Sequence, residues 1–278
     1  MKPLLVIDGD SFAHRAYHAL PKTIRRAGGR HPAGALVGFA NMLLRLWEAE
    51  APRAVLVGWD TLGTPTYRHE SFDGYQSGRE FDPELLEQLD LLPELVSALG
   101  FANAKAPGYE ADDFLAAAVA AEEGQGGEVL VATSDRDAFQ LASAQTTILQ
   151  PVRGVSELTR IGPAEVRERY GVEPAQVPDF IALRGDPSDR LPGAAGVGPK
   201  KAADVLREHG SLEDALAAGR FSKEAEELRL YRRIAALDAS APLPPLANQN
   251  PTWAEASSLA REWGMNQLAE RLAGMPSS

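Results

Sequence analysis

Three short apolar runs in the first half of the chain most constrain its fold. The runs are LLVI (4–7), AVLVGW (54–59) and EVLVAT (128–133). Runs that are this short, β-branched and continuously apolar are typical of strands buried on both faces. Helical patterns lie between them at residues 34–50, 83–100 and 112–124. The alternation predicts an α/β fold with a mostly parallel central sheet and helices on both faces.

The pattern changes after about residue 150, where a hairpin pattern, TTILQPVRGVSELT, is followed by helical segments only. We therefore divide the chain into an α/β core (1–160) and a helical part (161–278). No run of about eighteen apolar residues occurs, so no membrane span is predicted. The chain has no cysteine. This excludes disulfides and thiolate metal sites and favours a cytoplasmic location.

Each of the three predicted strands ends in aspartate: Asp8, then Asp60, then Asp135 with Asp137. Aspartate is a common turn residue after any strand. However, parallel strands end at one edge of a sheet, and open sheets carry their functional sites there. Because all three predicted strands end in aspartate, a shared acidic site is favoured over three ordinary turns.

Two further clusters, GYEADD (108–113) and GDPSD (185–189), add more carboxylates. The nine candidates are Asp8, Asp60, Glu110, Asp112, Asp113, Asp135, Asp137, Asp186 and Asp189. Carboxylates packed together repel one another unless cations neutralise them. Oxygen ligands without Cys or His favour Mg²⁺ or Mn²⁺ over Zn²⁺, and a pair of such ions can clamp a phosphate. These acids contribute most of the net charge of −11, so that charge does not exclude a nucleic-acid partner.

A phosphate-binding element, PGAAGVGPKKAADVL, follows the last acidic cluster at residues 192–206. Gly196 and Gly198 allow a backbone to approach a phosphate closely. Pro199 suits the first position of a helix, and Lys200 and Lys201 add charge where free N–H groups already attract anions. The stretch predicts a helix–hairpin–helix that grips a nucleic-acid backbone; a tight turn between two helices is the simpler alternative.

Together these motifs resemble the 5′-nuclease family, which includes the N-terminal domain of bacterial DNA polymerase I and the flap endonucleases. The resemblance covers most of residues 4–210 through LLVIDGDSFAHRAYHAL, VLVGWD, YRHESFDGYQSGR, APGYEADDFLA, VATSDRDAFQL and FIALRGDPSDRLPGAAGVGPKKA. It implies a PIN-like core and a structure-specific flap endonuclease or 5′-3′ exonuclease that hydrolyses DNA by a two-metal-ion mechanism in replication and repair. The implied partner is branched or 5′-flapped DNA, with RNA primer ends as a further candidate, and the expected state is a monomer.

The resemblance also implies roles for single residues. Asp8, Asp60, Glu110 and Asp112 would hold the first metal ion, and Asp112, Asp135, Asp137 and Asp189 would surround the second. Asp113 and Asp186 would act in an outer shell or at a third, weaker site. Residues 62–84 would form a helical arch, where Tyr75 stacks on a base and Arg68 and Arg79 contact phosphates. A helix–three-turn–helix at 177–209 would hold K⁺ through the backbone of Gly193, Ala194 and Val197.

Two positions depart from the family pattern. Gln76 stands where the family has a lysine that helps to neutralise the scissile phosphate, and Arg190 stands where the bacterial branch more often has asparagine. The first departure leaves open a second reading, a catalytically weak paralogue that only binds branched DNA. A third reading is an aspartate-nucleophile phosphatase, which LLVIDGDS and GDPSD could serve. That reading leaves the other two acidic clusters without a role.

Overall fold

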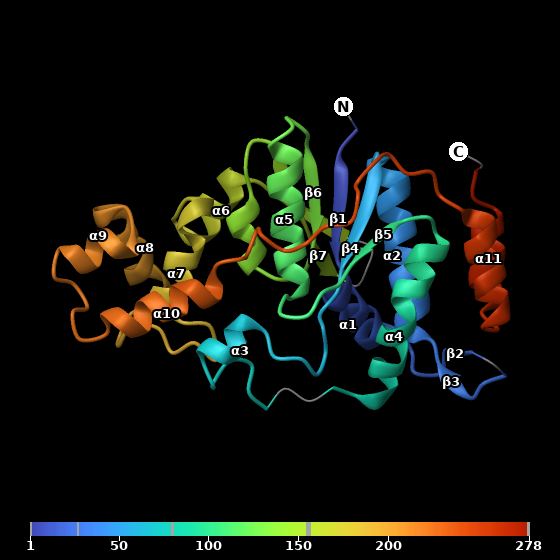
Figure 1. Cartoon of the computed structure of the whole chain (residues 1–278), viewed down its shortest axis with the longest axis horizontal. Helices are drawn as coiled ribbons and strands as arrows, with labels where there is room; N and C mark the ends of the chain where they lie inside the picture. Colours follow the sequence, from blue (N-terminus) through green and yellow to red (C-terminus); the bar gives the residue numbers. More distant parts are fainter. Residues whose placement is uncertain (1, 27, 79–80, 154–156, 277–278) are drawn as a thin grey trace.

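The structure is a computed structural model, and it describes residues 2–26, 28–78, 81–153 and 157–276. In this part of the chain the central sheet has six strands in the order β5-β4-β1-β6-β7-β8. Figure 1 labels β5, β4, β1, β6 and β7 of this sheet. Their bounds are β1 Leu4–Asp8, β4 Ala54–Gly58, β5 Ala102–Ala104, β6 Val129–Ala132, β7 Thr146–Arg153 and β8 Glu157–Ile161. Neighbours are parallel except β8, which is antiparallel to β7. The predicted mostly parallel sheet is confirmed.

Helices cover both faces of the sheet because alternate residues of β1 point in opposite directions. Leu4 and Val6 join a core with helices α5 (Ala111–Glu123), α6 (Pro163–Tyr170) and α7 (Val177–Arg184) and the short 3₁₀ helix η1 (Asp137–Leu141). A second 3₁₀ helix, η2 (Pro174–Gln176), directly precedes α7. Leu5 and Ile7 join a second core with α1 (Gly9–Ala19), α2 (Gly34–Glu50) and α4 (Pro83–Ala98). All four β1 side chains are fully buried. This double burial explains why the strands read as continuous apolar runs.

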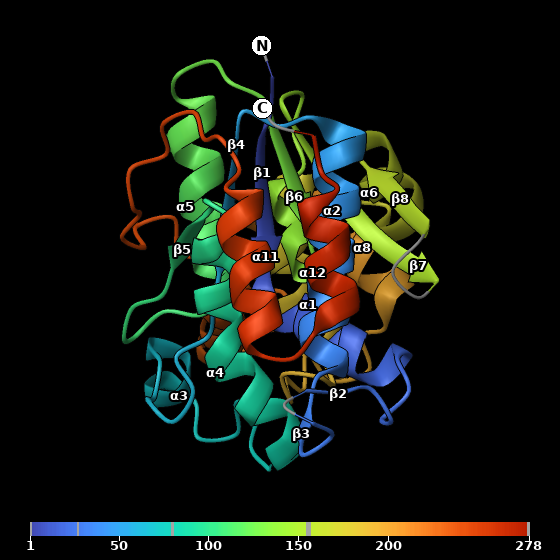
Figure 2. The same ribbon diagram turned by 90° about the vertical axis from the view of Figure 1, so that its right-hand side faces the viewer.

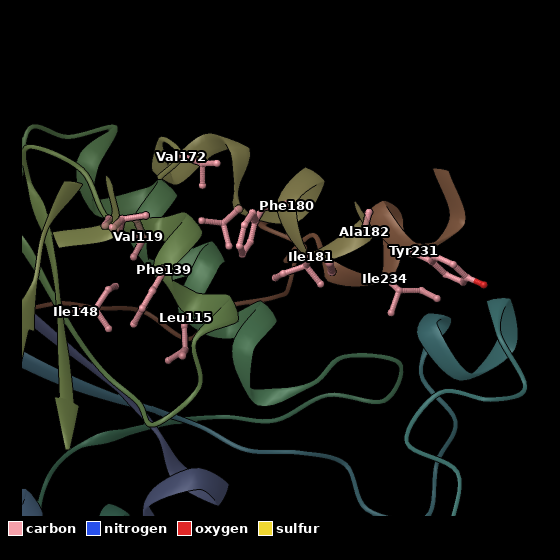
Figure 3. Packing of buried hydrophobic residues seen from close by; sticks show 14 of the residues in the cluster. Leu115, Val119, Phe139, Ile148, Val172, Phe180, Ile181, Ala182, Tyr231 and Ile234 are labelled. Atoms are coloured by element: carbon pink, nitrogen blue, oxygen red, sulfur yellow. The ribbon is translucent and has the colours of Figure 1, made fainter. Parts of the chain in front are cut away.

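The first core continues from the sheet into the helices of the second half (Figure 3). Phe139 of η1 and Phe180 of α7 lie between the sheet and Ile234 of α10. The further helices are α8 (Pro199–His209), α9 (Leu212–Ala217) and α10 (Ala225–Ala235). Because one apolar core spans both parts, the loop after α7 has a defined place relative to the strand ends.

The last two helices, α11 (Trp253–Glu262) and α12 (Asn266–Ala273), lie on the α2 and α4 side of the sheet (Figure 2). Trp253 makes edge contacts with Trp47 and Phe101, at ring-centroid distances of 6.0 and 6.1 Å. The connection from α10 crosses back over the molecule to reach them (Figure 1). The division at residue 160 stays a prediction, but residues 253–273 pack with the α/β core and not with the other late helices.

The predicted helical arch is helical only at α3 (Tyr67–Ser71) within the described residues of 62–84 before α4 begins at Pro83. Gly63, Pro65, Gly74 and Gly78 interrupt the segment, and glycine and proline disfavour helix interiors. The remaining strands, β2 (Arg25–Arg26) and β3 (His31–Pro32), form a small antiparallel ribbon. Within the described ranges, no helix is both long and apolar enough to cross a bilayer.

Candidate active site

An open cleft of about 1040 Å³ lies at the carboxyl edge of the sheet, and we call it the acidic cleft. Its acidic lining residues are Asp8, Asp10, Asp60, Glu110, Asp112, Asp135, Asp137, Asp186 and Asp189. Eight of these are among the nine predicted carboxylates. They come from five separate segments of the chain, which the parallel strands and the shared core bring to one place.

Asp8 is the last residue of β1 and the N-cap of α1. Its two carboxylate oxygens accept hydrogen bonds from the Ser11 amide (2.9 Å) and the Thr133 hydroxyl (2.7 Å). Burial raises the pKa of Asp8 to about 7 despite these bonds, and the charges of Asp60 and Asp135 add to the rise. The site therefore resists full ionisation unless a cation offsets the charge.

Asp10 was not among the predicted site residues, although it lines the acidic cleft. It is 6% exposed, and its carboxylate accepts the Asp60 amide at 2.7 Å. Asp60 in turn accepts the Ala111 amide at 2.8 Å. Burial and the charge of Asp60 raise the pKa of Asp10. The clue was in the sequence, since Asp10 follows Asp8 at the same DxD spacing as the pair in TSDRD.

The three acids at the start of α5 divide between two environments. Asp113 is fully buried, and its carboxylate accepts hydrogen bonds from Arg68 Nη1 (2.9 Å) and Nη2 (2.7 Å). It also accepts the amides of Glu110 (3.0 Å) and Asp238 (2.9 Å). Donors from the chain therefore saturate Asp113, which does not line the acidic cleft. Asp113 therefore caps α5 and pairs with Arg68. Its expected role in an outer shell or at a third, weaker site stays a prediction.

Asp112 and Glu110 face the acidic cleft instead. Burial raises the pKa of Asp112, and the charges of Asp8, Asp135 and Asp60 raise it further. Burial also raises the pKa of Glu110. Asp112 and Asp113, which are adjacent in α5, thus have different surroundings, because successive side chains of a helix point about 100° apart.

The DxD pair follows β6 and is held by its own turn. The Asp135 amide donates to Thr133 Oγ1 (3.0 Å), and the Asp137 amide donates to the Asp135 carboxylate (2.9 Å). Asp135 is exposed, whereas Asp137 is 8% exposed. Burial raises the pKa of Asp137, with further contributions from Asp135, Asp189 and Asp186.

The GDPSD cluster forms a tight loop after α7. Two backbone hydrogen bonds of 2.8 Å between Asp186 and Leu191 close it, and Asp186 also accepts the Ser188 amide at 2.8 Å. Burial raises the pKa of Asp189 to about 6, although a hydrogen bond from Gln76 opposes the rise. The loop follows a helix and not a strand, which argues against the aspartate-nucleophile phosphatase reading.

The arch residues lie closer to the protein than expected. Arg68 is 2% exposed, and it donates hydrogen bonds to Glu110 (3.0 Å) and to the carbonyl of Ile234 (2.9 Å) in addition to Asp113. Tyr75 is 4% exposed and donates to Glu110 at 2.9 Å. Both side chains line the acidic cleft but are bonded to protein groups in this conformation. Their expected contacts with a phosphate and a base stay predictions. Arg79 lies outside the described residues.

The predicted hairpin precedes α8 and borders a second hollow of about 560 Å³. A Cβ at Gly193 (φ +73°) would lie 2.4 Å from the backbone nitrogen of Gly185, so glycine is required where these turns meet. Ala194 and Val197 are buried beside it. At the start of the helix, Lys200 and Lys201 are exposed, as are Gly196 and Gly198 in the loop.

The acidic cleft suits a hard divalent cation by its chemistry, since its acidic lining offers carboxylate oxygens, and burial raises the pKa of two of these groups, Asp8 and Asp137. In the part of the chain that the structure describes, however, no three acidic or histidine side chains already converge as ligands of one ion do. Cation binding would therefore need side chains to rearrange.

Two protein-family models match the chain. The chain matches "5'-3' exonuclease, N-terminal resolvase-like domain" over residues 3–171 and "5'-3' exonuclease, C-terminal SAM fold" over residues 172–256. It is 45% identical over 210 residues to DNA polymerase I of Mycobacterium tuberculosis, covering 75% of this chain and 23% of that protein. It is 37% identical over 286 residues to DNA polymerase I of Bacillus caldotenax, covering 98% and 32%. The chain thus spans about a quarter to a third of the length of these relatives.

Solved structures share the fold at low sequence identity. Bacteriophage T5 5'-exonuclease, in a structure with bound divalent metal ions (zinc), is 18% identical with a TM-score of 0.71, and 98% of each chain is covered. Human GEN1, in complex with Holliday junction DNA, is 14% identical with a TM-score of 0.61, covering 97% of this chain and 70% of that one.

Proposed function

The chain belongs to the 5′-3′ exonuclease family, and on this premise we propose that it is a structure-specific 5′ nuclease that hydrolyses DNA phosphodiester bonds. The acidic cleft carries this proposal, because eight predicted carboxylates from five segments meet there. The pKa values of Asp8, Asp112 and Asp137 are raised by two causes, burial and the charges of neighbouring carboxylates. A group of acids held in this way is unfavourable for the apo protein and is typical of a functional site.

We propose that two divalent ions, Mg²⁺ or Mn²⁺, bind in the acidic cleft. Asp8, Asp60, Glu110 and Asp112 would hold one ion, and Asp112, Asp135, Asp137 and Asp189 would surround the other. Asp186 would contribute to an outer shell or to a third, weaker site. When bound, such ions lower the pKa of a water molecule and stabilise charge on a phosphate.

The chain's own residues would orient these ligands and hold the DNA. Ser11 and Thr133 fix both oxygens of Asp8, and the amide of Ala111 fixes Asp60. Lys200 and Lys201 would bind backbone phosphates of the duplex without reading its sequence. We also propose K⁺ at the backbone of Gly193, Ala194 and Val197, which borders the second hollow.

The proposed substrate is branched or 5′-flapped DNA, with RNA primer ends as a further candidate. The structures of the T5 flap endonuclease with DNA and metal ions and of GEN1 with Holliday junction DNA support a DNA substrate by the similarity of their folds. We propose further that the protein acts in replication and repair, as a monomer and in the cytoplasm. Proteins in that compartment rarely depend on disulfides, which fits a chain without cysteine.

The test is hydrolysis of a 5′-flap oligonucleotide with Mg²⁺, with Mn²⁺ and with a chelator. Asp135→Asn and Asp189→Asn should each slow cleavage roughly 10³-fold or more, because ligand loss removes several kcal/mol of transition-state stabilisation. Both should keep metal-free DNA binding. Asp90→Asn, an exposed change on α4, is the matched control.

Three outcomes would count against the proposal. Cleavage by either cleft variant at more than about a tenth of the wild-type rate would contradict the metal assignment. Flap binding without cleavage by the wild type would favour the weak paralogue. Hydrolysis of p-nitrophenyl phosphate in place of DNA would favour the phosphatase reading.

A further inference from the structure

Arg68 of the arch lines the acidic cleft but is paired with Asp113. A second part of the arch, which lines the cleft through Tyr75 and Gln76, carries no positive charge among its described residues. It is the turn Tyr75–Gly78, which we call the arch turn. Gln76 Nε2 donates to Tyr75 Oη and to Asp189 Oδ1, both at 3.0 Å. This amide closes the arch turn onto the acidic loop, but it is neutral. It cannot offset the charge of an anionic strand that passes the same point.

A cation reaches the arch turn from the opposite side. Arg190 follows Asp189 in the loop that the Asp186–Leu191 hydrogen bonds close. Its guanidinium donates from Nη1 to Ser77 Oγ at 3.1 Å, across 113 residues of sequence. The backbone of Arg190 is left-handed, with φ +57°. Such a conformation costs a non-glycine residue about 1 kcal/mol or more and is commonest at functional sites.

The arch turn leaves room for this guanidinium. A Cβ added at Gly78 would lie 3.1 Å from Arg190 Nη2, closer than almost all real contacts of that kind. A side chain at position 78 would therefore require the guanidinium to shift by a few tenths of an ångström. The contact with Ser77 uses only one of the five donor hydrogens of Arg190.

Arg190 does not itself line the acidic cleft, but its loop neighbours Ser188 and Asp189 do. It differs from two of the arginines that line the cleft. Arg68 is buried against Asp113, and Arg184 pairs with Asp186 at 3.2 Å. Arg190 is exposed, and within the described ranges no carboxylate lies within 4.0 Å of its guanidinium. Its charge and most of its donors are therefore available to an incoming anion.

We propose that Arg190 binds a phosphate of the substrate strand at the mouth of the acidic cleft, and that Ser77 is its partner only when no substrate is bound. The inference rests on the proposed nuclease function and makes Arg190 a positioning residue. A guanidinium can bind a phosphate through two parallel charged hydrogen bonds, which are stronger than its single neutral bond to a hydroxyl. Exchanging Ser77 for phosphate is therefore favourable.

The first experiment compares single-turnover rates on a 5′-flap oligonucleotide with Mg²⁺. Arg190→Ala should slow cleavage about tenfold, as expected for the loss of one charged contact that orients the substrate. Arg190→Lys should retain most of the rate, because it keeps the charge. Ser77→Ala should stay within about twofold of wild type, because it removes only the resting partner. Arg261→Ala is the matched control, since it removes one exposed arginine from α11.

The second experiment identifies the phosphate. Flap substrates carrying a single neutral methylphosphonate linkage are scanned across the bonds that flank the cleavage site. At one position the neutral linkage should slow the wild type about tenfold yet have no further effect on Arg190→Ala, because the contact is already lost. A residue that only supports the arch would not show this position-specific loss of coupling.

Three results would overturn the inference while leaving the proposed function intact: Arg190→Ala cleaving like Arg261→Ala, Ser77→Ala as slow as Arg190→Ala, or every linkage slowing both proteins equally. In each case the wild type still cleaves the flap. If the wild type cleaves no flap under any metal condition, the proposed function itself fails, and the inference fails with it.

Discussion

Asp112 and Asp113 are adjacent in sequence, and the structure predicts opposite consequences when each is changed to asparagine. Asp113 is fully buried and accepts four hydrogen bonds, two of them from Arg68, which is itself 2% exposed. Asp113→Asn leaves that guanidinium buried with Glu110 as its remaining charged partner. Breaking a buried pair from one side costs about 3–5 kcal/mol. For a protein of this size that corresponds to a fall in Tm of roughly 10 °C.

Asp112→Asn should leave Tm unchanged or raise it. Burial and three nearby aspartates raise the pKa of Asp112, so its charge is unfavourable in the metal-free fold. The same change should abolish cleavage, because Asp112 lies in the acidic cleft between both proposed ion sites. Stability and activity therefore separate at two consecutive residues.

The assay is thermal unfolding followed by circular dichroism in chelator, together with single-turnover cleavage in Mg²⁺. A double variant, Arg68→Met with Asp113→Leu, is the control, because replacing both partners with apolar groups should recover part of the loss. The reasoning is refuted if Asp113→Asn melts within about 2 °C of wild type yet no longer cleaves or binds Mn²⁺. That result would favour a metal-binding role for Asp113.

Three further predictions follow from other parts of the molecule. In chelator, the free energy of unfolding should fall as pH rises from about 4 to about 7. The reason is that the folded-state pKa values of Asp8 (about 7) and Asp189 (about 6) exceed the usual 3.8, so the native state binds more protons than the unfolded state in that window. Mn²⁺ should raise Tm more at pH 8 than at pH 5, and an equal rise at both pH values would contradict the metal assignment. Changing Lys200 and Lys201 together to alanine should weaken DNA binding for all sequences and reduce the salt slope by about one per lost contact, measured by fluorescence anisotropy; a sequence-selective loss would contradict backbone binding. Trp253→Ala should lower the free energy of unfolding by about 3–5 kcal/mol in urea titrations without lowering the cleavage rate at low temperature; a stable but inactive variant would show that α11 has a role in catalysis.

The sequence alone identified the sheet, most of the helices and the acidic edge. Leu4–Asp8, Ala54–Gly58 and Val129–Ala132 are central strands, as their apolar runs predict. Their final carboxylates meet because parallel strands end at one edge. These features depend on local periodicity and on a rule of sheet topology, so no knowledge of distant contacts is needed to find them.

Only the tertiary structure decided what each acid contacts and where the late helices lie. Asp112 faces the acidic cleft and Asp113 faces Arg68, 45 residues earlier in the chain, and the pattern EADD does not distinguish them. An amphipathic pattern shows that α11 has an apolar face but not that Trp47 and Phe101 cover it. The contact of Arg190 with Ser77 likewise joins two loops, and no sequence pattern in either loop indicates that they lie together. Pairings between distant segments are set by packing of the whole chain, which the sequence specifies only through the completed fold.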